Sequence, residues 1–165
     1  MKSIIHFVAL ILAMCCSAGV HAADDVETAL QDMRRAIATP QVVIDYCAKE
    51  YPDYAENLRG AFDLWRRKHA DLIFEIEARA DRMARRAARR GEEKTADPEH
   101  DDPILQYRKG YEEKLRRMPE AESRPACARY GAELTNGGVN VSDLEKMFAV
   151  QLKLIRGKDA VPGPN

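Results

Sequence analysis

The sequence predicts an all-α protein: an antiparallel helical bundle or hairpin with one long central helix, over about residues 53–90, and one disulfide. After the first 22 residues, apolar residues recur with helical periodicity almost everywhere, and no long stretch alternates like a strand. Residues 53–90 contain no proline and one glycine, Gly60. At 1.5 Å per residue they would form a helix of roughly 55 Å.

The first 22 residues have the features of a cleavable signal peptide. Lys2 precedes an apolar run over residues 4–16, and small residues at positions 20 and 22 flank His21, as a signal peptidase requires. The run is shorter than the roughly 20 residues that span a bilayer, and no later run is as long. We expect export to the periplasm, a mature chain starting at residue 23 and no membrane-spanning segment. The alternative is a lipoprotein attached through Cys15 or Cys16.

The mature chain is expected to be a single helical domain over residues 23–158. An acidic loop interrupts it at residues 92–103, and a flexible tail rich in proline and glycine follows at 159–165. Without the signal peptide, 25 basic residues face 27 acidic ones. This near-neutral balance gives no general attraction to nucleic acid or to an anionic membrane.

Cys47 and Cys127 are the two cysteines of the expected mature chain. In an oxidising compartment, an even pair far apart in sequence most simply forms a disulfide. The alternative is a reactive or metal-binding thiol pair. No C-x-x-C spacing and no neighbouring histidine support that alternative, so the sequence predicts a structural disulfide.

Two helices are expected before the long one. The first, about residues 24–38, carries an apolar stripe that includes Leu30 and Met33. Thr39-Pro40 is typical of a new helix start, with a capping side chain followed by proline at the first helical position. The second helix should end near Glu50, before Pro52.

The long helix over residues 53–90 offers one apolar face along its length, and Gly91 should end it. The stripe consists of Tyr54, Leu58, Ala61, Phe62, Trp65, Leu72, Ile73, Ile76, Ala80, Met83 and Ala87. The chain should then return over residues 104–135, which brings Cys127 back toward Cys47. A last helix, capped by Asn140 or Ser142, should end at Gly157. Its expected apolar stripe is Leu144, Met147, Phe148, Leu152 and Ile155.

An arginine cluster near the end of the long helix is a candidate anion-binding face. Its members are Arg79, Arg82, Arg85, Arg86, Arg89 and Arg90, of which Arg79, Arg82, Arg86 and Arg89 are the principal candidates. Such a face would suit phosphate-bearing lipid or an acidic partner. The simpler interpretation is a solvated helix end neutralised by the acids of the following loop. No aromatic residue lies among the arginines, which argues against single-stranded nucleic acid.

Two histidines are candidate ligand or metal residues. His69 lies in the apolar stripe of the long helix, with no carboxylate, histidine or cysteine three or four residues away. A core histidine with a satisfied nitrogen is the simpler interpretation. His100 lies in the acidic loop, which lacks the glycine pattern of an EF-hand. The identity of any metal stays open.

The usual enzymatic motifs are absent. The sequence contains no G-x-S-x-G, H-E-x-x-H or phosphate-binding glycine loop. The two serines of the expected mature chain, Ser123 and Ser142, lie where helix caps are expected. We therefore expect no catalytic residues, no cofactor and no enzymatic activity.

A short pattern over residues 46–65 resembles short exported helical proteins of Gram-negative bacteria with no assigned function. It consists of Tyr46-Cys47, Tyr51-Pro52, Ala61-Phe62 and Trp65. The resemblance implies export, helicity and a structural cysteine, and nothing about activity.

We therefore expect a non-catalytic protein that acts by protein–protein contact, as an adaptor, assembly or inhibitor-like module. The apolar stripe of the long helix is the expected contact surface, for another protein or a second copy. The alternative is a periplasmic bundle that binds a small ligand or a metal through His69 or His100. An acidic lipid surface is a further alternative partner, through the arginine cluster.

Overall fold

The computed structural model describes residues 3–91, 102–137 and 140–158, with side chains for residues 25–91, 102–137 and 141–157. Every regular element in these residues is helical, which confirms the all-α class. In chain order the elements are α1 (Ser3–Glu50), η1 (Pro52–Tyr54), α2 (Ala55–Lys68), α3 (Ala70–Arg89), α5 (Pro103–Arg116), α6 (Glu120–Asn136), η2 (Asn140–Ser142), α7 (Leu144–Met147) and α8 (Ala149–Lys158). The acidic loop with His100 and the tail at 159–165 lie outside the described residues.

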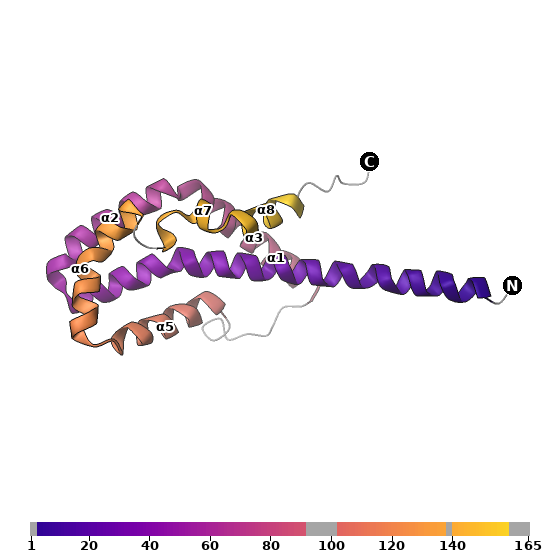
Figure 1. The fold of residues 1–165 in the computed structure, drawn as a ribbon, viewed down its shortest axis with the longest axis horizontal. Coiled ribbons are helices and arrows are strands. Elements are labelled where there is room, and N and C mark those ends of the chain that lie inside the picture. The colour runs from indigo at the N-terminus through magenta and orange to yellow at the C-terminus, as the bar shows by residue number, and fades with distance from the viewer. Residues whose placement is uncertain (1–2, 92–101, 138–139, 159–165) are drawn as a thin grey trace.

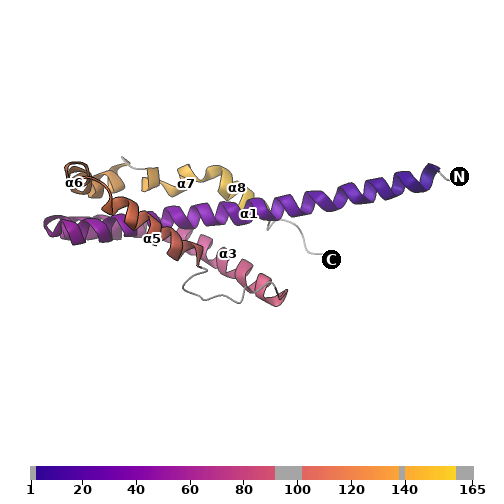
Figure 2. The same cartoon turned by 90° about the horizontal axis from the view of Figure 1, so that it is seen from below.

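Helix α1 is the central helix of the bundle (Figure 1). Its second half contacts α2, α3, α5, α6 and α8, and it buries Leu30, Met33, Val43 and Ile44. The first half extends beyond the other helices in both views (Figure 2). The expected signal peptide lies in this extension, and its cleavage stays a prediction.

The expected helix break at Thr39-Pro40 is wrong, because α1 runs through both residues. The Thr39 hydroxyl donates to the carbonyl of Arg35 at 2.9 Å and lies 2.7 Å from the hydroxyl of Tyr107 on α5. Pro40 is buried in the core. The missing N–H of proline costs one helical hydrogen bond, and the packing of α1 against α5 keeps the helix intact across it.

The expected long helix is divided at His69 into α2 and α3. The backbone of His69 (φ −108°, ψ 13°) leaves the helical region, while hydrogen bonds continue on both sides. The apolar stripe continues across this break: Leu58, Trp65, Leu72 and Ile76 are all buried. Periodicity therefore predicted the correct buried face and missed the bend.

The disulfide and the return of the chain are confirmed. The Sγ atoms of Cys47 on α1 and Cys127 on α6 lie 1.98 Å apart, with a Cα–Cα distance of 5.5 Å. Helix α6 also packs closely on α2, where a Cβ added at Gly131 would lie 3.2 Å from Oδ1 of Asn57. The hydroxyls of Tyr51 and Ser123, each four residues from a cysteine of the disulfide, meet at 2.6 Å. One end of the bundle is therefore both crosslinked and tightly packed.

The last segment is broken into short pieces. The side chain of Asp143, rather than Asn140 or Ser142, caps α7 by accepting from the backbone N–H of Lys146 at 3.2 Å. Helix α8 then continues past Gly157 to Lys158, so the expected end at Gly157 is wrong. The expected apolar stripe is confirmed, because its residues are buried or half-buried: Leu144, Met147, Phe148, Leu152 and Ile155.

Candidate functional site

The large apolar side chains that remain exposed lie on one set of helices. They are Leu64 on α2, Phe74 on α3, and Val150 and Leu154 on α8. Phe74 is 76% exposed and Val150 79%. Among the side chains that the structure describes, α1, α5 and α6 expose no large apolar residue of this kind. The exposed apolar surface is thus concentrated on α2, α3 and α8.

Side-chain hydrogen bonds join α8 to the first half of α3. The Arg156 side chain donates to Oε2 of Glu75 at 2.7 Å, and Nη1 of Arg79 donates to the carbonyl oxygen of Ile155 at 3.1 Å. The buried Ile76 and Leu152 lie in the same apolar core as these helices. These contacts join α3 to α8, and we call the exposed side of the two helices, with the apolar residues Phe74, Val150 and Leu154, the α3–α8 surface.

The outward direction of these side chains follows from helical geometry. Phe74 is two residues, or about 200°, from the buried Ile76, so it points away from the core. Val150 and Leu154 are four residues apart and share one face of α8. The apolar side chains therefore face solvent.

Three side chains at the end of α2 position the segment that leads into α8. The indole Nε1 of Trp65 donates to the carbonyl of Val141 at 2.7 Å, and Nζ of Lys68 donates to the carbonyl of Ser142 at 3.0 Å. Nε2 of His69 lies 3.1 Å from the same Ser142 carbonyl and acts as a donor there. We call these three residues the polar clamp. Helices as short as α7 and α8 need such tertiary contacts to form.

The Glu75 carboxylate is held in its charged form by α8. The hydrogen bond from Arg156 lowers the pKa of Glu75 against the opposing effect of burial, and the charges of Arg156 and Arg79 act in the same direction. Glu75 thus links α3 and α8 at neutral pH.

The candidate anion-binding arginines separate into two groups. Arg79 is largely buried, ion-paired with Glu75 and bonded to α8, so its role is structural. Arg82, Arg86 and Arg89 are exposed, as is Arg85. These four form no ion pair with any residue that the structure describes.

His69 is a buried member of the polar clamp. Its ring is 4% exposed, lies 5.3 Å from the Trp65 ring and uses Nε2 on Ser142. Within the described residues, no three histidine, cysteine or acidic side chains gather as a metal site would require. The local arrangement therefore suits a structural histidine.

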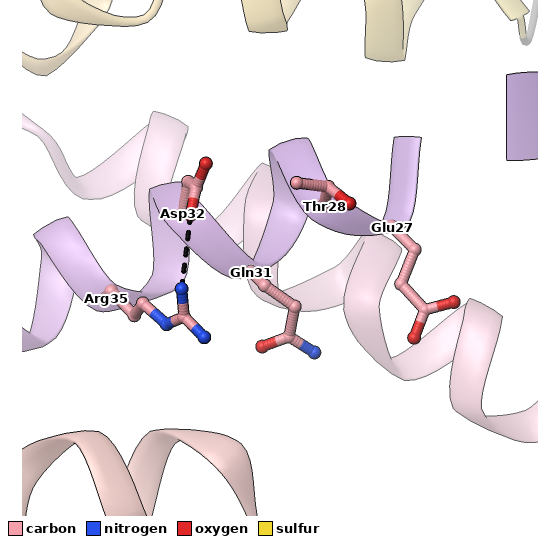
Figure 3. Close-up of a pocket in the computed structure, with 5 residues that line it drawn as sticks. All are labelled: Glu27, Thr28, Gln31, Asp32 and Arg35. Carbon is pink, nitrogen blue, oxygen red and sulfur yellow. Dashed lines mark hydrogen bonds and ion pairs between the residues drawn. The ribbon is translucent and has the colours of Figure 1, made fainter. Parts of the chain in front are cut away.

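An open hollow lies on the surface of α1. It measures about 350 Å³ and is lined by Glu27, Thr28, Gln31, Asp32 and Arg35 (Figure 3). Arg35 is paired with Asp32 at 3.3 Å, and Oε1 of Gln31 is buried with no hydrogen-bond partner among the described residues. These five residues come from two turns of one helix, so they form a shallow polar surface rather than an enclosed site.

A small apolar hollow of about 40 Å³ lies beside the disulfide, between α1, α5 and α6. Tyr130 lines it, and its hydroxyl is buried with no hydrogen-bond partner in the described residues. Burial raises the pKa of Tyr130. The volume suits about one water molecule, not an organic ligand.

The comparisons with known proteins add no relatives. We found no protein-family model that matches this chain, and no match among curated proteins or solved structures. Among the described residues, no helix is both long enough and apolar enough to cross a membrane.

The apolar stripe of residues 53–90, which is the expected contact surface, is only partly covered. Leu58, Trp65, Leu72 and Ile76 are buried, whereas Phe62, Ile73 and Met83 are half-buried. Two large apolar residues of this region are exposed, Leu64 and Phe74, and both lie off the stripe. Their positions on the polar side of an amphipathic helix were the sequence signal that could have identified them.

Proposed function

We propose that this chain is an exported, non-catalytic helical protein that binds another protein through the α3–α8 surface. The observation that carries the proposal is the concentration of exposed apolar side chains on α2, α3 and α8. Large apolar side chains left exposed on neighbouring helices are candidates for protein interaction sites.

The contacts that hold α8 in place support a binding role for the α3–α8 surface. The polar clamp and the Glu75–Arg156 pair hold α8 in place although it leaves Val150 exposed. Side chains held on a rigid framework lose less entropy when a partner binds. The same contacts give His69 a structural role that requires no ligand.

Export is part of the proposal. The disulfide between Cys47 and Cys127 is typical of oxidising compartments such as the periplasm. The N-terminal sequence supplies the corresponding signal.

Site-specific photocrosslinking in the producing cells tests the proposal. A benzophenone amino acid replaces Phe74 or Val150, and in control variants it replaces Arg108 on α5 or Ala128 on α6, which are also exposed. We expect a discrete crosslinked protein from positions 74 and 150 and none from the controls. Equal crosslinking from all four positions, or none from 74 and 150, would contradict the proposed surface.

A further inference from the structure

The second half of α3 carries a set of exposed arginines that form no ion pair with the described residues, which do not include the acidic residues at 92–101. Elsewhere in those residues many arginines are ion-paired, for example Arg34 with Glu77 and Arg129 with Glu133. The exposed Arg82, Arg85, Arg86 and Arg89 are not.

Three of these arginines share the exposed face of Phe74. At about 100° per residue, Arg85 is about 20° from the direction of Phe74, Arg89 about 60° and Arg82 about 80°. Asp81 is the one acidic residue between residues 78 and 91. From Phe74 to Arg89 this face is roughly 22 Å long, at 1.5 Å per residue.

This part of α3 is also accessible. The fully buried residues of α3 are Leu72 and Ile76, both in its first half. Figure 2 shows the remainder of the helix diverging from α1 and α8. A partner can therefore approach the arginine face without displacing another helix.

We propose that the α3–α8 surface binds an acidic protein segment, which lies along α3 with an apolar side chain against Phe74 and carboxylates on Arg82, Arg85 and Arg89. This inference rests on the proposed function and specifies the chemistry of the partner. Guanidinium groups pair with carboxylates in two-bond geometry, and arginine and phenylalanine are enriched in protein interfaces.

The low apolar content of the second half of α3 favours a protein partner over a lipid surface. Beyond Ile76, the one large apolar residue of α3 is Met83, and it is half-buried against the core. The other apolar residues there are alanines. A helix that inserts into a membrane surface needs a continuous face of bulky apolar residues opposite its charges, and this face is missing.

The test uses the full-length protein with a crosslinker in place of Val150. One variant combines Arg82→Gln, Arg85→Gln and Arg89→Gln. A matched control combines Arg59→Gln, Arg67→Gln and Arg108→Gln, three exposed arginines without ion pairs in the described residues. We expect the α3 variant to reduce the crosslink yield about tenfold, equivalent to about 1.4 kcal/mol, and the control to change it less than about twofold.

Binding of two purified probes identifies the chemistry of the partner. Fluorescent poly-L-glutamate should bind the wild-type protein, and its affinity should fall as NaCl rises from about 50 to about 300 mM. It should bind the α3 variant about tenfold less tightly. Replacement of the same three arginines with lysine should retain most of the binding. Vesicles containing phosphatidylglycerol should not bind.

The outcomes separate the two proposals. A crosslink from position 150 that persists in the α3 variant leaves the proposed function standing and overturns the acidic-partner inference. Arginine-dependent binding to vesicles but not to poly-L-glutamate, or a crosslink to a second copy of the chain, also overturns it. No crosslink from positions 74 and 150 contradicts the proposed function itself.

Discussion

The polar clamp predicts that Trp65→Phe will lower the free energy of unfolding by more than the loss of a few buried ring atoms alone would. Trp65 is 2% exposed, and its indole nitrogen donates to the carbonyl of Val141 at 2.7 Å. Phenylalanine fills most of the same space but cannot donate. The substitution therefore leaves a buried carbonyl without its hydrogen bond at the point where η2 meets α2.

The magnitude follows from two contributions. A buried carbonyl that loses its partner costs about 1–3 kcal/mol. The smaller ring leaves a void that costs about 1 kcal/mol more, as a fraction of the loss expected for complete truncation. We expect the free energy of unfolding to fall by about 2–4 kcal/mol, which corresponds to a midpoint about 1–2 M lower in urea.

Urea denaturation followed by circular dichroism measures this loss, and hydrogen exchange measures its location. Amides of α8 should exchange faster in the variant, because η2 positions that helix. The control is Leu64→Ala, one residue away and 55% exposed, which should cost less than about 0.5 kcal/mol. A Trp65→Phe loss no larger than the control, or unchanged exchange in α8, would refute the role assigned to the clamp.

Three further predictions concern the stability of the bundle. Glu75→Gln should cost about 0.5–1 kcal/mol at pH 7. The folded-state pKa of Glu75 is lowered from its ordinary value of 4.5, so this contribution is present above that value and is lost as the pH falls through the folded-state pKa. Wild type and variant should therefore converge in acid denaturation. Cys47 and Cys127 are 80 residues apart, so reduction of their bond should lower the free energy of unfolding by about 4 kcal/mol on the chain-entropy model. Urea denaturation with and without dithiothreitol measures this loss. An unchanged unfolding midpoint would contradict the prediction. Gly110→Ala places its new Cβ with nothing within 4 Å, so it should stabilise the protein by about 0.5–1 kcal/mol. Gly131→Ala places its Cβ 3.2 Å from α2, so it should destabilise the protein by about 1 kcal/mol. Equal shifts of the melting temperature would contradict the close packing of α2 and α6.

The buried faces of the helices could be predicted from the sequence because they depend on local periodicity. Trp65, Ile76 and Leu152 were expected in the core, and all three are buried. The pairing of Cys47 with Cys127 followed from the presence of two cysteines and the expected return of the chain. Such features need no knowledge of which helices meet.

The helix boundaries were less predictable because distant residues decide them. Thr39-Pro40 has the local sequence of a helix start, yet Tyr107, 68 residues away, meets the Thr39 hydroxyl within a continuous α1. At His69 the bend accompanies a bond to Ser142, 73 residues away. No window around either residue contains its partner.

The candidate contact surface was missed for a related reason. The sequence indicates that an amphipathic face will be buried, but not by which helix. Once Leu72 and Ile76 are covered, the exposed apolar residue of α3 is Phe74. The arginines could be predicted as a group, but the separation of Arg79 from Arg82, Arg86 and Arg89 depends on where α8 lies.

The position of Trp65 gives the protein an intrinsic optical reporter. It is the one tryptophan of the chain, and its indole is buried against the carbonyl of Val141. Its emission should therefore be blue-shifted while the C-terminal segment is seated and should shift to the red when that segment detaches. Because the disulfide holds α1 and α6 at the other end of the bundle, the emission spectrum can follow the seating of α8 separately from global unfolding, without any added label.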